Sequence, residues 1–104
     1  MNELVATSSS LLTNEVGLHA RPSVKLTKLA KTFASRIEVA ASPDGPWVDA
    51  KSIVKVMAIK AAKGDTLHFR AAGPDAEQAL LALRALVDEA FHEKSGESAG
   101  AADG

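Results

Sequence analysis

The residues best able to do chemistry in this sequence lie in the hexapeptide 17–22, which reads Gly-Leu-His-Ala-Arg-Pro. Pro22 lacks a backbone N–H and suits the first turn of a helix, so a helix is expected to start at Ala20 or Arg21, directly after His19. The first amides of a helix have no partner within it and carry the positive end of its dipole, which favours a bound anion and an uncharged imidazole. The arginine adds a planar group that can bind phosphate through two hydrogen bonds. These parts describe a histidine able to accept and release a phosphoryl group.

Other roles for the histidines stay open on residue types alone. A histidine before a helix is often only a cap or a solvated side chain, and this is the alternative for His19. Three histidines without a cysteine, and without a second histidine four residues away, do not predict a metal site. His68 and His92 have no second chemical group near them in the sequence, so both are assigned structural roles. No bound metal or cofactor is expected.

The composition predicts one soluble domain. The chain has 104 residues, of which 46% are hydrophobic and 24% charged, which suffices for one compact core and is too little for two domains. The sequence has no cysteine, which excludes disulfides, thiolate metal sites and cysteine nucleophiles. No apolar run approaches the roughly 20 residues that cross a membrane, and no basic and then apolar segment opens the sequence. We therefore expect a cytoplasmic protein.

Charge is distributed unevenly, although the formal net charge is only −1. Residues 17–36 contain five basic residues and no acid, and residues 50–64 contain four basic residues and no acid. From Asp75 to the end, seven acids accompany only Arg84 and Lys94. This distribution predicts one positive face, suited to an anion or an acidic partner. A nucleic-acid-binding domain is the weakest of the function classes, because the net charge is near zero and aromatic residues make up only 4%.

Apolar periodicity and turn signals predict seven elements in the order β-α-β-β-α-β-α. Strands are expected at 5–13, 36–41, 47–49 and 65–71, and helices from 20 or 21 to 33, from 53 to 59 behind a Ser52 cap, and after the Gly73-Pro74-Asp75 turn. A four-stranded antiparallel sheet with the three helices on one face, an α+β two-layer sandwich, would bury their apolar stripes. Residues 1–93 are thus expected to form the domain, and residues 94–104 a disordered tail rich in small and acidic residues.

The apolar stripes of the three helices identify the expected helical part of the core. They comprise Leu26, Leu29, Ala30 and Phe33 on the first helix, Ile53, Val56 and Ile59 on the second, and Ala76, Leu80, Leu83, Val87 and Phe91 on the last. Lys25, Lys28 and Lys31 are expected to form a solvated strip beside the first stripe. Val54 and Met57 point away from the second stripe and are expected to be exposed.

Several segments together resemble the HPr family, the histidine-containing phosphocarriers of the bacterial phosphoenolpyruvate-dependent phosphotransferase system. The hexapeptide 17–22 is similar to the active-site sequence of the family, and residues 51–57 to the serine-headed short helix that is its second signature. Residues 62–67 resemble the approach to its last strand, and residues 72–79 the start of its last helix. The resemblance covers about residues 4–92, and the expected element order agrees with the open-faced sandwich of the family.

The resemblance implies a stoichiometric carrier rather than a complete enzyme. His19 matches the histidine that receives a phosphoryl group on Nδ1 from Enzyme I, which phosphoenolpyruvate charges, and passes it to an Enzyme IIA domain for sugar uptake. Arg21 matches the arginine that steadies the phosphate. The long turn at 42–46 leans toward the nitrogen-related branch, NPr, whereas Lys51 and Ser52 lean toward the sugar branch, so the branch stays open. The alternative function is a regulatory paralogue that acts mainly through phosphorylation-dependent protein binding.

The resemblance also implies a docking surface. In the family the short helix forms an apolar patch for Enzyme I and Enzyme IIA. The matching residues here are Ile53, Val54 and Met57, with Lys28, Lys31 and Lys55 around them to meet acidic surfaces, mere solvation being the alternative for each lysine. Ser52 matches the serine that an HPr kinase/phosphorylase modifies in some bacteria, and its alternative role is a plain helix cap. We expect the protein to act as a monomer.

Overall fold

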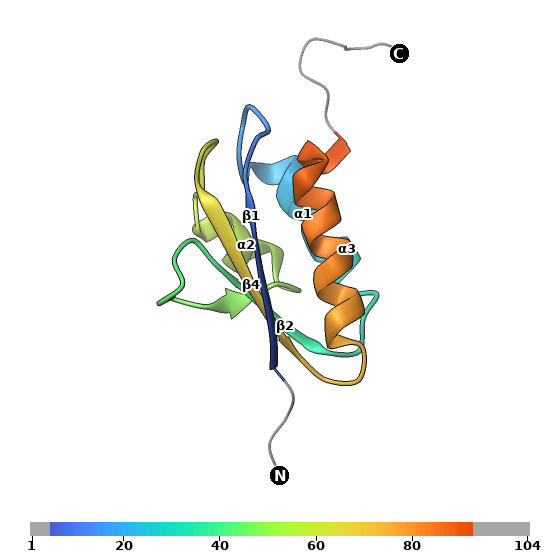
Figure 1. The fold of residues 1–104 in the computed structure, drawn as a ribbon. Coiled ribbons are helices and arrows are strands. Elements are labelled where there is room, and N and C mark those ends of the chain that lie inside the picture. The colour runs from blue at the N-terminus through green and yellow to red at the C-terminus, as the bar shows by residue number, and fades with distance from the viewer. Residues whose placement is uncertain (1–4, 93–104) are drawn as a thin grey trace.

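The computed structural model describes residues 5–92, which form one four-stranded antiparallel sheet and three helices (Figure 1). The elements are β1 Val5–Leu11, α1 Ala20–Ala30, β2 Arg36–Ala40, β3 Val48–Asp49, α2 Ile53–Ala58, β4 Thr66–Ala72, α3 Ala76–Asp88 and a short 3-10 turn, η1, at Ala90–His92. Their order and type confirm the prediction. The predicted tail, residues 94–104, lies outside the described residues. Within the described part of the chain, no helix is long and apolar enough to cross a membrane.

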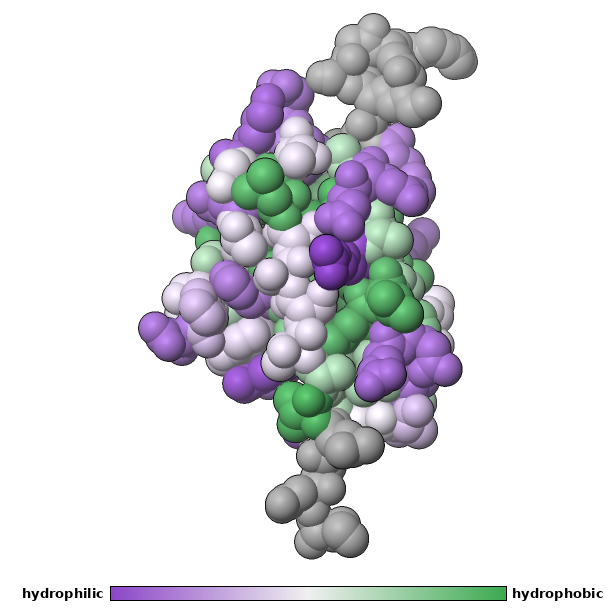
Figure 2. Space-filling view, viewed as in Figure 1, coloured by the Kyte–Doolittle hydropathy of each residue, from purple (hydrophilic) through white to green (hydrophobic). Residues whose placement is uncertain are grey.

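The sheet has the strand order β1-β4-β2-β3, so β4 is central and β1 forms an edge. Phe69 of β4 lies opposite Ser8 of β1 on one side and Val39 of β2 on the other. The strands alternate between buried and solvated residues, as predicted for a sheet that is covered on one face. Figure 2 shows pale, weakly polar side chains gathered over β1, with apolar side chains only in small separate patches.

One core holds the two layers together. The buried sheet residues Ile37 and Phe69 belong to the same apolar cluster as Leu26 of α1, Val56 of α2 and Leu83 of α3. A single shared cluster means that the three helices cover the same face of the sheet. The fold class is therefore the predicted α+β sandwich.

The open face of the sheet carries a small polar cluster. Arg70 donates from Nε to Glu38 Oε1 at 2.6 Å, and its guanidinium lies 4.3 Å from the centre of the Trp47 ring. Since a guanidinium is attracted to the face of an indole, this contact holds the 42–47 turn against the sheet.

The boundaries of the first and last helices differ from the prediction. The first helix ends at Ala30 rather than Phe33, because Phe33 N bonds to Ala30 O and closes a tighter last turn. The last helix ends at Asp88 rather than continuing through Phe91. Phe91 nevertheless stays fully buried, because the chain turns through left-handed backbone to return its ring to the core.

Three other expectations about strands and side chains were wrong. The first strand stops at Leu11 rather than Thr13, because its partner strand begins at Thr66, opposite that residue. Ile53 lies at the very start of α2 and is exposed rather than buried with Val56. Lys25 is half-buried rather than solvated, because its ammonium donates to Phe91 O at 2.6 Å.

Asp75 joins the start of α3 to the chain before β2. It is the N-cap residue, but its carboxylate makes no cap bond within the helix. It accepts instead from Ala34 N and Ser35 N, both at 2.9 Å, and from Ser35 Oγ at 2.6 Å. The Ser35 hydroxyl, with the Ala34 amide, lowers the pKa of Asp75 below its ordinary value of 3.8. Gly73, at φ 143°, permits this approach because a Cβ there would lie 2.6 Å from Ser35 Oγ.

Asp75→Asn is expected to lower the melting temperature at neutral pH, because an amide cannot accept all three of these bonds. The folded pKa of Asp75 is lowered, so its stabilisation is present above 3.8 and is lost as the pH falls through the lowered value. Thermal melts of the variant and the unchanged protein, from neutral pH to about pH 2, should therefore converge in acid. Asp44→Asn, in an exposed turn, is the control and should change little. A constant difference between the Asp75 variant and the unchanged protein at every pH would contradict this account.

Candidate functional site

The loop before α1 is held by close backbone contact with the segment between α2 and β4. Leu18 N donates to Ala61 O at 2.9 Å. Gly17 has φ +61°, and a Cβ at this position would lie 2.5 Å from Ala61 O and 2.7 Å from Ala62 Cα. Only glycine fits here without displacing backbone, so the glycine of the hexapeptide fixes where the chain enters the site.

His19 occupies the N-cap position of α1 with extended backbone, at φ −79° and ψ −177°. Its carbonyl accepts from Ser23 N at 3.0 Å, while its exposed ring makes no cap hydrogen bond. The capping role is therefore excluded, and the ring is available for chemistry. Pro22 has no N–H, so the amides of Ala20 and Arg21 are those that helix geometry leaves without an intrahelical partner beside the ring.

Asn14 lines the candidate site, although the sequence analysis does not single it out. Its side chain is 4% exposed, and Nδ2 donates to Gly17 O at 2.8 Å. The amide must be oriented this way, because a carbonyl oxygen cannot bond to Oδ1. Asn14 Oδ1 is then a buried acceptor without a partner among the described residues. An asparagine three residues before a glycine is a turn signal that could have identified the internal bond, but not the unpaired oxygen.

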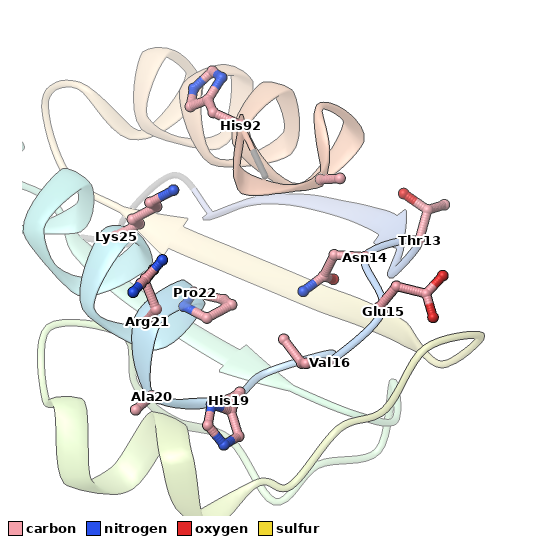
Figure 3. A pocket seen from close by; sticks show the side chains of 11 residues that line it. Thr13, Asn14, Glu15, Val16, His19, Ala20, Arg21, Pro22, Lys25 and His92 are labelled. Atoms are coloured by element: carbon pink, nitrogen blue, oxygen red, sulfur yellow. The ribbon is translucent and has the colours of Figure 1, made fainter. Parts of the chain in front are cut away.

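These residues line an open pocket of about 850 Å³ (Figure 3). It is bounded by the loop before α1, the first turns of α1 and the η1 turn, with the lining residues Thr13, Asn14, Glu15, Val16, His19, Ala20, Arg21, Pro22, Lys25, Ala90 and His92. Figure 3 shows the His19 ring and the Arg21 guanidinium leaving the helix start in different directions, with the guanidinium directed toward Lys25. The two predicted site residues thus share a pocket without touching in this conformation.

The three histidines are separated by the fold into two environments. His68 lies half-buried on β4. His92 lines the same pocket as His19, although the two residues lie 73 positions apart in the sequence. Its Nδ1 lies 3.1 Å from Glu89 Oε1. The fold therefore places His92 in the same pocket as His19, which its position in the sequence does not indicate, and its structural role stays a prediction.

Comparison with known proteins identifies the family. Residues 7–89 match the family model described as the PTS HPr component phosphorylation site. The chain is 46% identical over 80 residues to a phosphocarrier protein HPr from Cupriavidus necator, covering 77% of this chain and 88% of that one. It is 34% identical over 82 residues to the phosphocarrier protein NPr of Escherichia coli, covering 79% and 90%. The chain belongs to the HPr family of phosphocarrier proteins, components of the phosphotransferase system.

The fold supports the same assignment. The crystal structure of HPr from Thermoanaerobacter tengcongensis aligns with a TM-score of 0.79 at 33% identity, covering 86% of this chain and 99% of that one. The alignment thus spans nearly all of that solved chain, and the expected family resemblance is confirmed.

The residues predicted to dock partners in this HPr-family protein lie on the surface of α2 and at its side. Val54 is 74% exposed, Met57 39% and Ile53 37%. Lys28, Lys31 and Lys55 are also exposed. α2 packs against α1, and in Figure 3 its pale green ribbon passes beside Ala20 and His19. The apolar side chains of α2 and the histidine thus belong to one side of the domain.

Ser52 caps α2 as predicted. Its hydroxyl accepts from Lys55 N at 3.4 Å, which satisfies one amide of the first turn. The residue is half-buried, directly before the exposed Ile53 and Val54. In this structure Ser52 therefore has the role of a helix cap.

Proposed function

We propose that His19 accepts a phosphoryl group from phosphorylated Enzyme I and passes it to an Enzyme IIA domain, so that the protein serves as a stoichiometric carrier. The observation that best supports this proposal is the exposed ring of His19 at the N-cap position of α1. Neither nitrogen of the ring makes a capping hydrogen bond. A nucleophile that must meet two different partner proteins in turn needs this exposure.

In the proposed transfer, the Nδ1 lone pair of neutral His19 attacks phosphorus while the bond between phosphorus and the donor breaks. The proton of the ring stays on Nε2, and the new P–N bond leaves the phosphoryl oxygens near the amides of Ala20 and Arg21. These amides and the positive end of the helix dipole offset the negative charge of the group. The Arg21 guanidinium, which is directed toward Lys25, would rotate about its side-chain torsions to add two charge-assisted bonds. The onward transfer to Enzyme IIA reverses these steps.

The proposed docking surface comprises Ile53, Val54 and Met57, with the lysines 28, 31 and 55 around it. Apolar anchors supply most of the binding energy in small transient interfaces, while surrounding lysines raise the association rate with an acidic partner. Phosphorylation of Ser52 by an HPr kinase/phosphorylase would place about two negative charges directly before Ile53 and weaken this docking. We propose Ser52 as such a regulatory site.

Val54→Glu is expected to raise the KM for phosphoryl transfer from Enzyme I about tenfold, because it places a charge in the apolar centre of the proposed surface. Steady-state transfer assays measure this effect. Leu81→Glu is the matched control, because Leu81 on α3 is 70% exposed, against 74% for Val54. Equal KM values for the two variants would exclude α2 as the docking surface. Neither variant should lower the melting temperature by more than a few degrees, since both sites are exposed.

The test of the carrier function is phosphoryl transfer from phosphoenolpyruvate with purified Enzyme I from the sugar branch or from the nitrogen branch. Intact-protein mass spectrometry should show an acid-labile gain of one phosphoryl group. The Enzyme I that labels the protein faster identifies the branch. We expect the sugar branch, because the chain is 46% identical to the HPr of Cupriavidus necator and 34% identical to the NPr of Escherichia coli. No labelling by either Enzyme I would overturn the carrier proposal and favour a protein that acts only by binding regulators.

A further inference from the structure

The turn between α2 and β4, residues 61–65, holds both ends of the loop that leads into α1. At the start of the loop, Leu12 N donates to Asp65 O at 2.8 Å. At its end, Leu18 N donates to Ala61 O at 2.9 Å. The second of these bonds lies one residue before the proposed nucleophile. The position of that nucleophile therefore depends on how the turn is held.

The 61–65 turn is closed by a side chain. Asp65 N donates to Ala62 O, and Ala62 N donates in return to Asp65 Oδ2, both at 2.9 Å. Asp65 is exposed, and it does not belong to the pocket lining formed by the described residues. Its carboxylate thus acts on the turn and not on the reacting atoms.

The carboxylate and the loop bind the same peptide group. Ala62 N and Ala61 O belong to one peptide bond, which is planar and normally trans, so its N–H and C=O point in opposite directions. A hydrogen bond that fixes the N–H therefore also fixes the direction of the carbonyl. That carbonyl accepts from Leu18 N, and a Cβ on Gly17 would lie 2.5 Å from it.

The loop transmits this position to the histidine. Asn14 Nδ2 donates to Gly17 O at 2.8 Å and Gly17 N donates to Asn14 O at 3.3 Å, so the middle of the loop is closed on itself. His19 follows Leu18 directly, where the loop enters α1 (Figure 3). A shift of the Leu18 peptide therefore turns the ring relative to the first amides of α1.

We propose that Asp65 is a positioning residue for His19, acting through the Ala61–Ala62 peptide group. Its carboxylate holds that group, the group holds Leu18 N, and this bond sets the direction of the ring. The inference rests on the proposed carrier function. The role requires an oxygen that accepts a hydrogen bond and does not require a charge, so an asparagine can also fill it.

Asp65→Ala should lower the rate of phosphoryl transfer at saturating Enzyme I about tenfold, because the ring is no longer held in the productive direction. The KM should change little, since the proposed docking surface on α2 is untouched. Asp65→Asn should restore most of the rate. An alanine variant as fast as the unchanged protein, or an asparagine variant as slow as the alanine variant, would overturn the proposal.

Asp49→Ala is the matched control. Asp49 is also exposed, and its Oδ1 accepts from a backbone amide, Lys51 N, at 2.9 Å. Loss of this bond should cause a similar fall in melting temperature but leave the loop before α1 in place. The saturating rate of this variant should stay normal. An equal loss of rate in the two alanine variants would assign the effect to general loosening of the fold and refute a positioning role.

Hydrogen exchange of the Leu18 amide tests the positioning without phosphoryl transfer. In the unmodified protein, this amide should exchange about tenfold faster in Asp65→Ala than in Asp49→Ala, because its bond to Ala61 O opens more often. Equal exchange in the two variants would overturn the proposal. Absence of labelling in the unchanged protein would instead overturn the carrier function, and the exchange rates would still decide whether Asp65 positions the loop.

Discussion

His19→Gln is expected to abolish the acid-labile mass gain when the protein is incubated with Enzyme I and phosphoenolpyruvate. Glutamine preserves polarity at an exposed position that caps nothing, so the variant should fold and melt as the unchanged protein does. Its amide nitrogen has no lone pair available for attack on phosphorus, which removes the proposed nucleophile completely. Intact-mass spectrometry and a thermal melt of the same sample give both results.

The other two histidines provide the controls for this experiment. His68→Gln and His92→Gln should still gain one phosphoryl group. Neither residue lies in the hexapeptide 17–22, where the first amides of α1 are presented to the phosphoryl group. Labelling that survives in His19→Gln and disappears in His92→Gln would move the acceptor across the pocket and refute the assignment of His19.

Gly17→Ala is expected to destabilise the fold by about 2–4 kcal/mol, which combines the left-handed backbone penalty with the cost of forcing a Cβ against backbone. The added carbon would lie 2.5 Å from Ala61 O, so either the loop or the segment after α2 must move. For a domain of this size, we expect a fall in melting temperature of about 10 °C or more. Since Leu18 N bonds to the same carbonyl, the His19 ring should also be displaced and transfer slowed.

Gly64→Ala separates the two causes. Gly64 also has a positive φ, +96°, but a Cβ there meets no atom within 4 Å. This variant should lose only about 1 kcal/mol, the backbone penalty alone, and should accept phosphate at the normal rate. Equal melting temperatures for the two alanine variants would show that contact with Ala61 does not determine the loop position.

Local signals in the sequence determined most of the fold. Pro22 in a first turn predicts where α1 begins, Ser52 predicts the cap of α2, and alternation over residues 67–71 predicts a one-sided strand. These signals depend on atoms within a few residues of one another, so they act in the same way in any surroundings. The closeness of His19 and Arg21 in the sequence, within one hexapeptide, is a local signal of the same kind.

The predictions that were wrong concern positions decided by distant partners. Helical periodicity alone assigned Phe91 to α3, but the core accepts its ring only after the helix has ended and the backbone has turned. The same periodicity assigned Ile53 to the core, although a residue in the first turn of a six-residue helix lies at its edge. Burial depends on what packs against each residue, and no local pattern contains this information.

The sequence by itself determined which residues carry the proposed chemistry, and the tertiary structure decided what surrounds those residues. The proposed nucleophile His19, the start of α1 and the Arg21 guanidinium are neighbours along the chain. The close approach of Ala61 to Gly17, and the position of His92 in the pocket that Lys25 also lines, depend on contacts across the whole domain. Such contacts form only when the core closes, because the loss of chain entropy in joining distant segments must be offset by burial of the apolar stripes.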